Sequence, residues 1–184
     1  MPRAKIGVIG GTGLYDVEGL NDIEEVEIDT PFGKPSDAIT IGRLEGVGIA
    51  FLPRHGKGHR ISPTEIPVRA NIYALKSLGV EYIIAINSTG SFKPEIKPGD
   101  LVIPDQLIDR TRSRANSFFG EGIVAHISFA EPFCPVLSQV LYHAAREVGA
   151  KVHPKGAYVA IEGPAFSTRA ESQLYRSWGL TLLV

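Results

Sequence analysis

Cysteine is almost absent from the sequence: Cys134 is the only one among 184 residues, so no disulfide can form within the chain. This absence is typical of the reducing cytoplasm, and no signal-peptide pattern precedes the first strand-like segment. Long apolar runs are missing too, since none approaches the roughly 18 residues of a membrane-spanning helix. The sequence therefore predicts a cytoplasmic protein with no membrane partner. Cys134 lies between Phe133 and Pro135 and is expected to be buried rather than nucleophilic.

A surplus of charge of either sign is also lacking. The chain has 19 Lys and Arg against 20 Asp and Glu, a net charge of −1. A basic surface for nucleic acid is therefore not expected. The five histidines have no metal-ligand spacing, so no metal is expected either. An anionic ligand would have to be held by a few placed cations.

Short apolar segments alternate with helical patterns along the chain. Residues 109–134 are an exception, since they form an irregular, Arg-rich segment that is typical of a long functional or interface loop. The alternation predicts an α/β fold built around one sheet. Strands are expected at 6–9, 24–28, 38–43, 47–53, 82–86, 101–103, 152–161 and 179–184, and helices at 66–78, 135–148 and 168–178.

A glycine-rich turn, Gly10-Gly11-Thr12-Gly13, follows the first expected strand. Backbone N–H groups and the Thr12 hydroxyl of such a turn can bind phosphate oxygens. The dinucleotide-binding pattern is not met, because Asp16 stands where a third glycine belongs. The alternative is a plain turn without ligand.

Two further polar turns also follow apolar strands. Arg54 and His55 come after the strand at 47–53, and Asn87 and Ser88 come after the strand at 82–86. Arginine binds phosphate through a planar fork of donors, and small polar groups at a strand end suit an anion or a ribose. Each has a structural alternative: a surface arginine with a loop histidine, or a polar turn that caps a helix. Together, the three turns predict convergence at one edge of the sheet.

A fourth segment, Glu162 to Glu171, contains an aromatic residue beside a hydroxyl. Phe166 could stack on a planar base and Ser167 could hydrogen-bond it. The alternative is a core phenylalanine followed by a helix-capping pair, since Thr168 and Glu171 have capping-box spacing.

In this order, the four segments resemble the methylthioadenosine phosphorylase branch of the purine nucleoside phosphorylases. The resemblance implies a single nucleoside phosphorylase domain over residues 1–184, incomplete at its C-terminus, with a central mixed β-sheet flanked by helices. The matching stretches extend over nearly the whole chain to Gly179: 9–14, 29–37, 54–56, 98–100, 109–111, 130–135, 161–164 and 166–172.

The resemblance also implies roles for single residues. His126 would reach across a subunit boundary toward the sugar of a neighbouring active site, which implies a homotrimer. Phe166 would stack on the purine. Asn87-Ser88-Thr89 differs from the eukaryotic form, so side-chain contacts there are less secure than backbone contacts. The residues expected around the phosphate are Thr12, Arg54, His55, Asn87 and Ser88.

Ser167 bears on the choice of substrate. Relatives that prefer guanine or hypoxanthine have Glu at this place, where it pairs with a purine N–H that adenine lacks. The resemblance therefore implies phosphorolysis of S-methyl-5′-thioadenosine to adenine and 5-methylthioribose 1-phosphate. Inorganic phosphate would be the co-substrate, and no cofactor is expected.

The implied mechanism is dissociative: the ribose becomes oxocarbenium-like, and bound phosphate stabilises and then captures it. In the family an Asp from a later segment protonates the departing purine, so that residue is expected beyond Val184. Residues 179–184 are expected to arise from a frameshift. The 184-residue chain is accordingly expected to be poorly soluble and at most weakly active. Two alternatives remain open: a phosphorylase for inosine-type nucleosides, and a non-catalytic remnant that binds phosphate or a partner chain.

Overall fold

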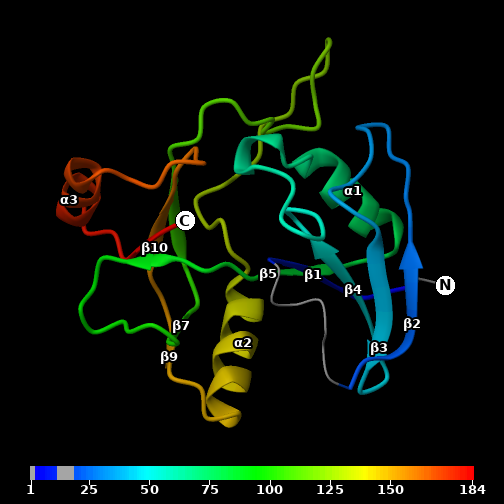
Figure 1. The fold of residues 1–184 in the computed structure, drawn as a ribbon, viewed down its shortest axis with the longest axis horizontal. Helices are drawn as coiled ribbons and strands as arrows, with labels where there is room; N and C mark the ends of the chain where they lie inside the picture. The colour runs from blue at the N-terminus through cyan, green and yellow to red at the C-terminus, as the bar shows by residue number, and fades with distance from the viewer. Residues whose placement is uncertain (1–2, 12–18) are drawn as a thin grey trace. The chain divides into compact units, whose positions relative to one another are not determined.

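The computed structural model describes residues 3–11 and 19–184 (Figure 1). The chain divides into two units: one of residues 1–87 and 114–118, the other of residues 88–113 and 119–184. The described strands are distributed over three sheets, with three α-helices, so the predicted α/β class is confirmed, while the strands form three sheets and not the one that was expected. Within the described ranges, no helix is both long and apolar enough to cross a membrane.

The first unit is built on a five-stranded mixed sheet with the strand order β2-β3-β4-β1-β5. The apolar strand β1 pairs in parallel with β4 and with β5. Gly7 lets α1 and the residues after it approach β1, because a β-carbon there would lie 3.0 Å from Val80 Cγ1 and 3.4 Å from Leu75 Cδ1. The elements are β1 (Ile6–Gly10), β2 (Asn21–Val26), β3 (Ile39–Leu44), β4 (Val47–Pro53), η2 (Pro63–Glu65), α1 (Val68–Ser77) and β5 (Tyr82–Ala85).

Helix α1 covers this sheet with the face that its apolar spacing predicts. Ala74 and Leu75 are fully buried, and they pack in one cluster with residues of β3 and β4 such as Ile39 and Leu52. Gly79 ends the helix with a φ of 90°, which glycine adopts without strain. The expected helix at 66–78 is therefore confirmed as α1, which begins two residues later than expected, after Pro67, and is preceded by η2.

One polar pair is buried under α1. Asn71 and Ser36 are only 3% and 2% exposed. The Ser36 amide donates to Asn71 Oδ1 at 2.8 Å, and Asn71 Nδ2 donates to Ser36 Oγ at 2.8 Å. The pair fixes the segment before β3 to the helix.

Asn71→Ala should therefore lower the free energy of unfolding by about 2–3 kcal/mol, because the Ser36 amide and hydroxyl would stay buried without a partner. Urea denaturation of both proteins measures the difference. Ser77→Ala is the matched control, since it removes a single hydrogen bond, from Ser77 Oγ to the Ala74 carbonyl, on the same helix. Equal losses in the two variants would contradict the role given to Asn71.

The second unit contains a four-stranded sheet, β6-β11-β10-β8, and a two-stranded sheet, β7-β9. The strand expected at 152–161 is split, because the segment from Pro154 to Gly156 turns between β9 and β10. Strand β8 was not predicted. The elements are β6 (Gly90–Ser91), β7 (Leu101–Val102), β8 (Gln106–Asp109), α2 (Pro135–Glu147), β9 (Val152–His153), β10 (Ala157–Ala160), α3 (Arg169–Ser177) and β11 (Leu182–Leu183).

Both helices of this unit begin where their sequences predict. Thr168 and Glu171 form the expected capping box of α3: Thr168 Oγ1 accepts from the Glu171 amide at 3.2 Å. Pro135 opens α2, and Cys134 caps it by accepting a hydrogen bond from the Leu137 amide. Cys134 is exposed, so the expected burial is wrong. Its position at the helix end explains this, because a capping side chain lies outside the helix body.

Asp100 connects β7 and β9. Its Oδ2 accepts from Lys151 Nζ at 2.8 Å, from His153 Nε2 at 2.9 Å and from the Lys97 amide at 3.0 Å. The hydrogen bond from His153, then those from Lys151 and Lys97, hold the pKa of the Asp100 carboxyl well below its usual range. The lowered pKa stabilises the fold above the ordinary value of about 3.9. This stabilisation is lost as the pH falls from there through the lowered pKa.

Asp100→Asn should consequently lower the melting temperature most at pH 5 and above. The difference in melting temperature between the two proteins should narrow as the pH falls below about 4, because the unfolded chain then binds a proton at Asp100 that the folded protein, with its lowered pKa, still excludes. Thermal unfolding over a pH series measures this. A difference in melting temperature that stays constant between pH 2 and pH 7 would show that the charge of Asp100 contributes nothing to the stability of the fold.

Candidate active site

Three strand ends meet at one edge of the first sheet. Because β4, β1 and β5 are adjacent and parallel, their carboxyl ends lie side by side, with Gly10 opposite Pro53 and Ile9 opposite Ala85. The turns after these strands begin at Gly11, Arg54 and Ile86. The predicted convergence is therefore found for the described residues of the first unit. Thr12 lies outside the described residues.

Arg54 is fixed at the centre of this edge. Its amide donates to the Gly10 carbonyl at 3.1 Å, and its Nη1 donates to the Ile86 carbonyl at 2.8 Å. A β-carbon on Gly11 would be 3.8 Å from Arg54 Nη2, so the guanidinium lies against the glycine turn. One arginine thus contacts the ends of β1 and β5 while it extends from β4. A planar fork of donors in such a place is suited to an oxyanion.

His55 is buried next to Arg54 and has partners at both ring nitrogens. Nδ1 lies 2.9 Å from the Ile61 carbonyl, and Nε2 accepts from Arg54 Nε at 3.2 Å. Burial lowers the pKa of His55; the bond to Ile61 opposes this, and the nearby Arg54 charge lowers it further. The neutral ring with its proton on Nδ1 fits both contacts. In this arrangement His55 orients the arginine.

Asn87 is exposed and directly follows Ile86, whose carbonyl binds Arg54. It is the last residue of the first unit, and Ser88 is the first of the second. The structure thus brings together Arg54, His55 and the backbone before Asn87. Ser88 belongs to the second unit. The contribution of the Ile86 carbonyl was not predicted, because a backbone oxygen leaves no signal in the residue type.

In the second unit, Ser88 and the segment from Glu162 to Ser167 emerge at one sheet edge. Strands β10 and β11 are parallel, so the chain after Ala160 leaves at the carboxyl end of β11. Strand β6 is antiparallel to β11, with Gly90 opposite Leu183, so the residues before Gly90 lie at that same end. The shared edge is where ligands of α/β proteins bind.

Phe166 and Ser167 differ in their surroundings. The Phe166 side chain is 90% exposed in the chain, so the predicted alternative of a core phenylalanine is wrong. Ser167 Oγ is 2.8 Å from Ser172 Oγ, which orients it next to the first turn of α3. His126 is exposed in the irregular segment between β8 and α2.

Glu162 has a structural role that the sequence did not reveal. Its Oε2 accepts hydrogen bonds from the amides of Arg112 and Ser113, the latter at 3.1 Å. These bonds tie the start of the Arg-rich segment to the turn that follows β10. No local sequence pattern could predict this contact, because Glu162 and its partners are about 50 residues apart in the sequence.

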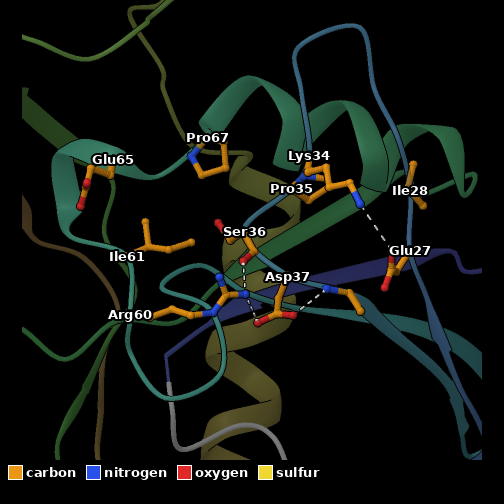
Figure 2. Close-up of a pocket in the computed structure, with 11 residues that line it drawn as sticks. Glu27, Ile28, Lys34, Pro35, Ser36, Asp37, Arg60, Ile61, Glu65 and Pro67 are labelled. Atoms are coloured by element: carbon orange, nitrogen blue, oxygen red, sulfur yellow. Dashed lines mark hydrogen bonds and ion pairs between the residues drawn. The ribbon is translucent and has the colours of Figure 1, made fainter.

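A pocket of about 460 Å³ lies in the first unit, beside η2 and the segment before β3 (Figure 2). Four of its charged residues form two ion pairs, Lys34 with Glu27 at 3.6 Å and Arg60 with Asp37 at 2.8 Å. None of the described site residues named above lines it. Within the described residues, no three His, Cys, Asp or Glu side chains are grouped as a metal site.

An arginine held where parallel strands end defines an α/β protein with a small-ligand site at its strand ends. Residues 5–183 match the model of the phosphorylase superfamily. A crystal structure of a methylthioadenosine phosphorylase from an Antarctic soil metagenomic library is 49% identical and covers the whole chain, with a TM-score of 0.96. The chain therefore belongs to the phosphorylase superfamily and, within it, to the methylthioadenosine phosphorylase family.

Other relatives agree with this membership. The S-methyl-5′-thioadenosine phosphorylase of Geobacter sulfurreducens is 59% identical over 97% of the chain, and that of Synechocystis is 56% identical over 100%. The Schistosoma mansoni enzyme, solved in complex with adenine, is 39% identical over 98% of the chain, with a TM-score of 0.92. The chain spans only 63% of the length of the Geobacter relative, 57% of the Synechocystis one and 65% of the metagenomic one.

Proposed function

We propose that the protein cleaves S-methyl-5′-thioadenosine with inorganic phosphate, releasing adenine and 5-methylthioribose 1-phosphate. The observation that carries the proposal is Arg54, anchored to Gly10 and Ile86 where three parallel strands end. The reaction needs an anion held in a fixed position, and a positioned guanidinium supplies the charge and geometry for this. The adenine bound to the Schistosoma relative supports a purine nucleoside as the second ligand.

In the proposed reaction the residues of this chain bind and orient. The residues proposed to bind the phosphate are Arg54, His55, Asn87, Ser88 and Thr12, and His55 holds the arginine in place. The phosphate charge stabilises the oxocarbenium-like ribose as the bond to the purine breaks, and a phosphate oxygen then forms the new bond to the sugar.

The purine would be bound by the second unit. Its exposed Phe166 ring offers a face for stacking, and the Ser167 hydroxyl offers a neutral partner for a 6-aminopurine. His126, which is exposed, would contact the sugar bound in a neighbouring subunit of a homotrimer. A cytoplasmic location is proposed on the single cysteine, and no cofactor is invoked.

The decisive test is the release of adenine from S-methyl-5′-thioadenosine, followed by chromatography with and without phosphate. Release that requires phosphate and yields 5-methylthioribose 1-phosphate is the expected result. Methylthioinosine, assayed in parallel, should be a poorer substrate. Free 5-methylthioribose in place of the phosphorylated sugar would identify a hydrolase and overturn the proposal, as would a preference for methylthioinosine.

A further inference from the structure

A carboxylate outside the predicted site holds the turn that carries Arg54 and His55. Asp37 lies just before β3, and its side chain is 19% exposed. Its Oδ2 accepts from the Lys57 amide at 2.8 Å and from Arg60 Nη2 at 2.8 Å, as Figure 2 shows for Arg60. Its Oδ1 accepts from the Ala38 amide at 3.0 Å. Asp37 therefore binds both ends of the 57–60 turn from a distant part of the chain.

The turn from His55 to Ile61 closes on its own first residue. The amides of Arg60 and Ile61 both donate to the His55 carbonyl at 3.0 Å, and the Ile61 carbonyl meets His55 Nδ1 at 2.9 Å. Gly56 and Gly58 have φ values of 69° and 78°, which the tight path requires. A β-carbon on Gly56 would come within 3.0 Å of Arg60 Nε, so the Arg60 side chain packs onto the start of the turn.

The last link joins the turn to the arginine. His55 Nε2 accepts from Arg54 Nε at 3.2 Å, which sets the rotation of the guanidinium while Nη1 stays on the Ile86 carbonyl. A displacement of the turn would move the His55 ring, and the ring would no longer receive the Arg54 Nε hydrogen.

We infer that Asp37 is a positioning residue for the phosphate site: by fixing Lys57 and Arg60 it holds the 55–61 turn, and through His55 it sets the orientation of the Arg54 guanidinium. This rests on the proposed function of Arg54. Burial opposes ionisation of Asp37, but the hydrogen bonds from Lys57, Arg60 and Ala38 outweigh it, so the pKa of Asp37 is lowered. The carboxylate is accordingly charged at neutral pH and keeps its hold on Arg60.

The experiment compares Asp37→Asn with Glu27→Gln, which removes the carboxylate of the other ion pair at the pocket in Figure 2 but does not touch the turn. Calorimetric titration with inorganic phosphate should give a dissociation constant about tenfold higher for Asp37→Asn, since a misplaced binding group loses much of its effect. Glu27→Gln should bind phosphate as the unsubstituted protein does.

Repeating Asp37→Asn in an Arg54→Lys background distinguishes the positioning role, which acts through Arg54, from a purely structural role of Asp37. Lysine has no Nε–H for His55, so the tenfold effect should there fall to less than about twofold, as expected when two groups act through one link. An effect of Asp37→Asn that stays tenfold in the Arg54→Lys background would overturn the inference. So would the lack of any effect when Arg54 is present.

A second measurement does not depend on phosphate. Nitrogen-15 spectra of the histidine rings should show His55 with its proton on Nδ1 in the unsubstituted protein and in Glu27→Gln, and a mixture of tautomers in Asp37→Asn. If the protein binds no phosphate, the proposed function is wrong, and the histidine spectra still decide the positioning role. An unchanged His55 spectrum in Asp37→Asn would refute it.

Discussion

Arg54→Ala is expected to raise the dissociation constant for inorganic phosphate by about 10- to 100-fold, because a charge-assisted hydrogen-bonding contact contributes about 1.5–3 kcal/mol. The guanidinium is held at its Nη1 by the Ile86 carbonyl and at its Nε by His55, so it needs no rearrangement to receive an anion. Isothermal titration with phosphate measures the change directly.

Arg43→Ala provides the matched control for this variant. Arg43 lies on β3 of the same sheet, and its Nη1 donates to the Gly46 carbonyl at 3.0 Å, away from the strand ends discussed above. Arg43→Ala changes the net charge of the protein by the same amount as Arg54→Ala. Any general electrostatic effect on the affinity for phosphate will therefore appear in both variants. Unchanged phosphate affinity in a folded Arg54→Ala protein would remove Arg54 from the site.

The regular elements could be predicted where local signals agree. The apolar run of β1 ends at glycine, the spacing of Leu75 and Leu78 fits one buried helix face, and the capping box at Thr168 marks the start of α3. The strand expected at 152–161 was too long because it ran across Pro154 and Gly156, two residue types that interrupt strands. The structure turns there, and a β-carbon on Gly156 would lie 3.0 Å from Thr181 Cγ2.

The sequence predicts at which strand ends the site lies, but it does not predict the contacts that its side chains make. Arg54 and His55 attract attention because their residue types suit phosphate and they follow an apolar strand. Their actual partners, the Ile86 carbonyl and the Ile61 carbonyl, depend on the tertiary path of the chain. Asp37 was visible only as part of a family motif, since Lys57 and Arg60 are 20 and 23 residues away.

The largest effect on substrate choice is expected from Ser167→Glu, made in a version of the protein that has the full length of its relatives. The new carboxylate would face a 6-aminopurine that has no ring N–H to offer, so desolvating it without a partner should lower kcat/KM for S-methyl-5′-thioadenosine by about 100-fold. Methylthioinosine, which carries that N–H, should lose much less. The ratio of kcat/KM for the two substrates, together with the affinities for adenine and hypoxanthine, measures the change.

Ser172→Ala shows whether the effect of Ser167→Glu comes from the added carboxylate or from the lost hydrogen bond between Ser167 and Ser172. In the structure Ser167 Oγ and Ser172 Oγ are 2.8 Å apart, so both substitutions remove this hydrogen bond, but only Ser167→Glu adds a carboxylate. If the hydrogen bond alone positions the base, the two variants should lose adenine affinity equally. If the unpaired carboxylate is the cause, Ser172→Ala should stay within about fivefold of the unsubstituted protein, because one partly buried hydroxyl pair contributes about 1 kcal/mol. If Ser167→Glu leaves kcat/KM unchanged for each of the two substrates, Ser167 lies outside the purine site. The choice between the two purines would then depend on residues elsewhere in the protein.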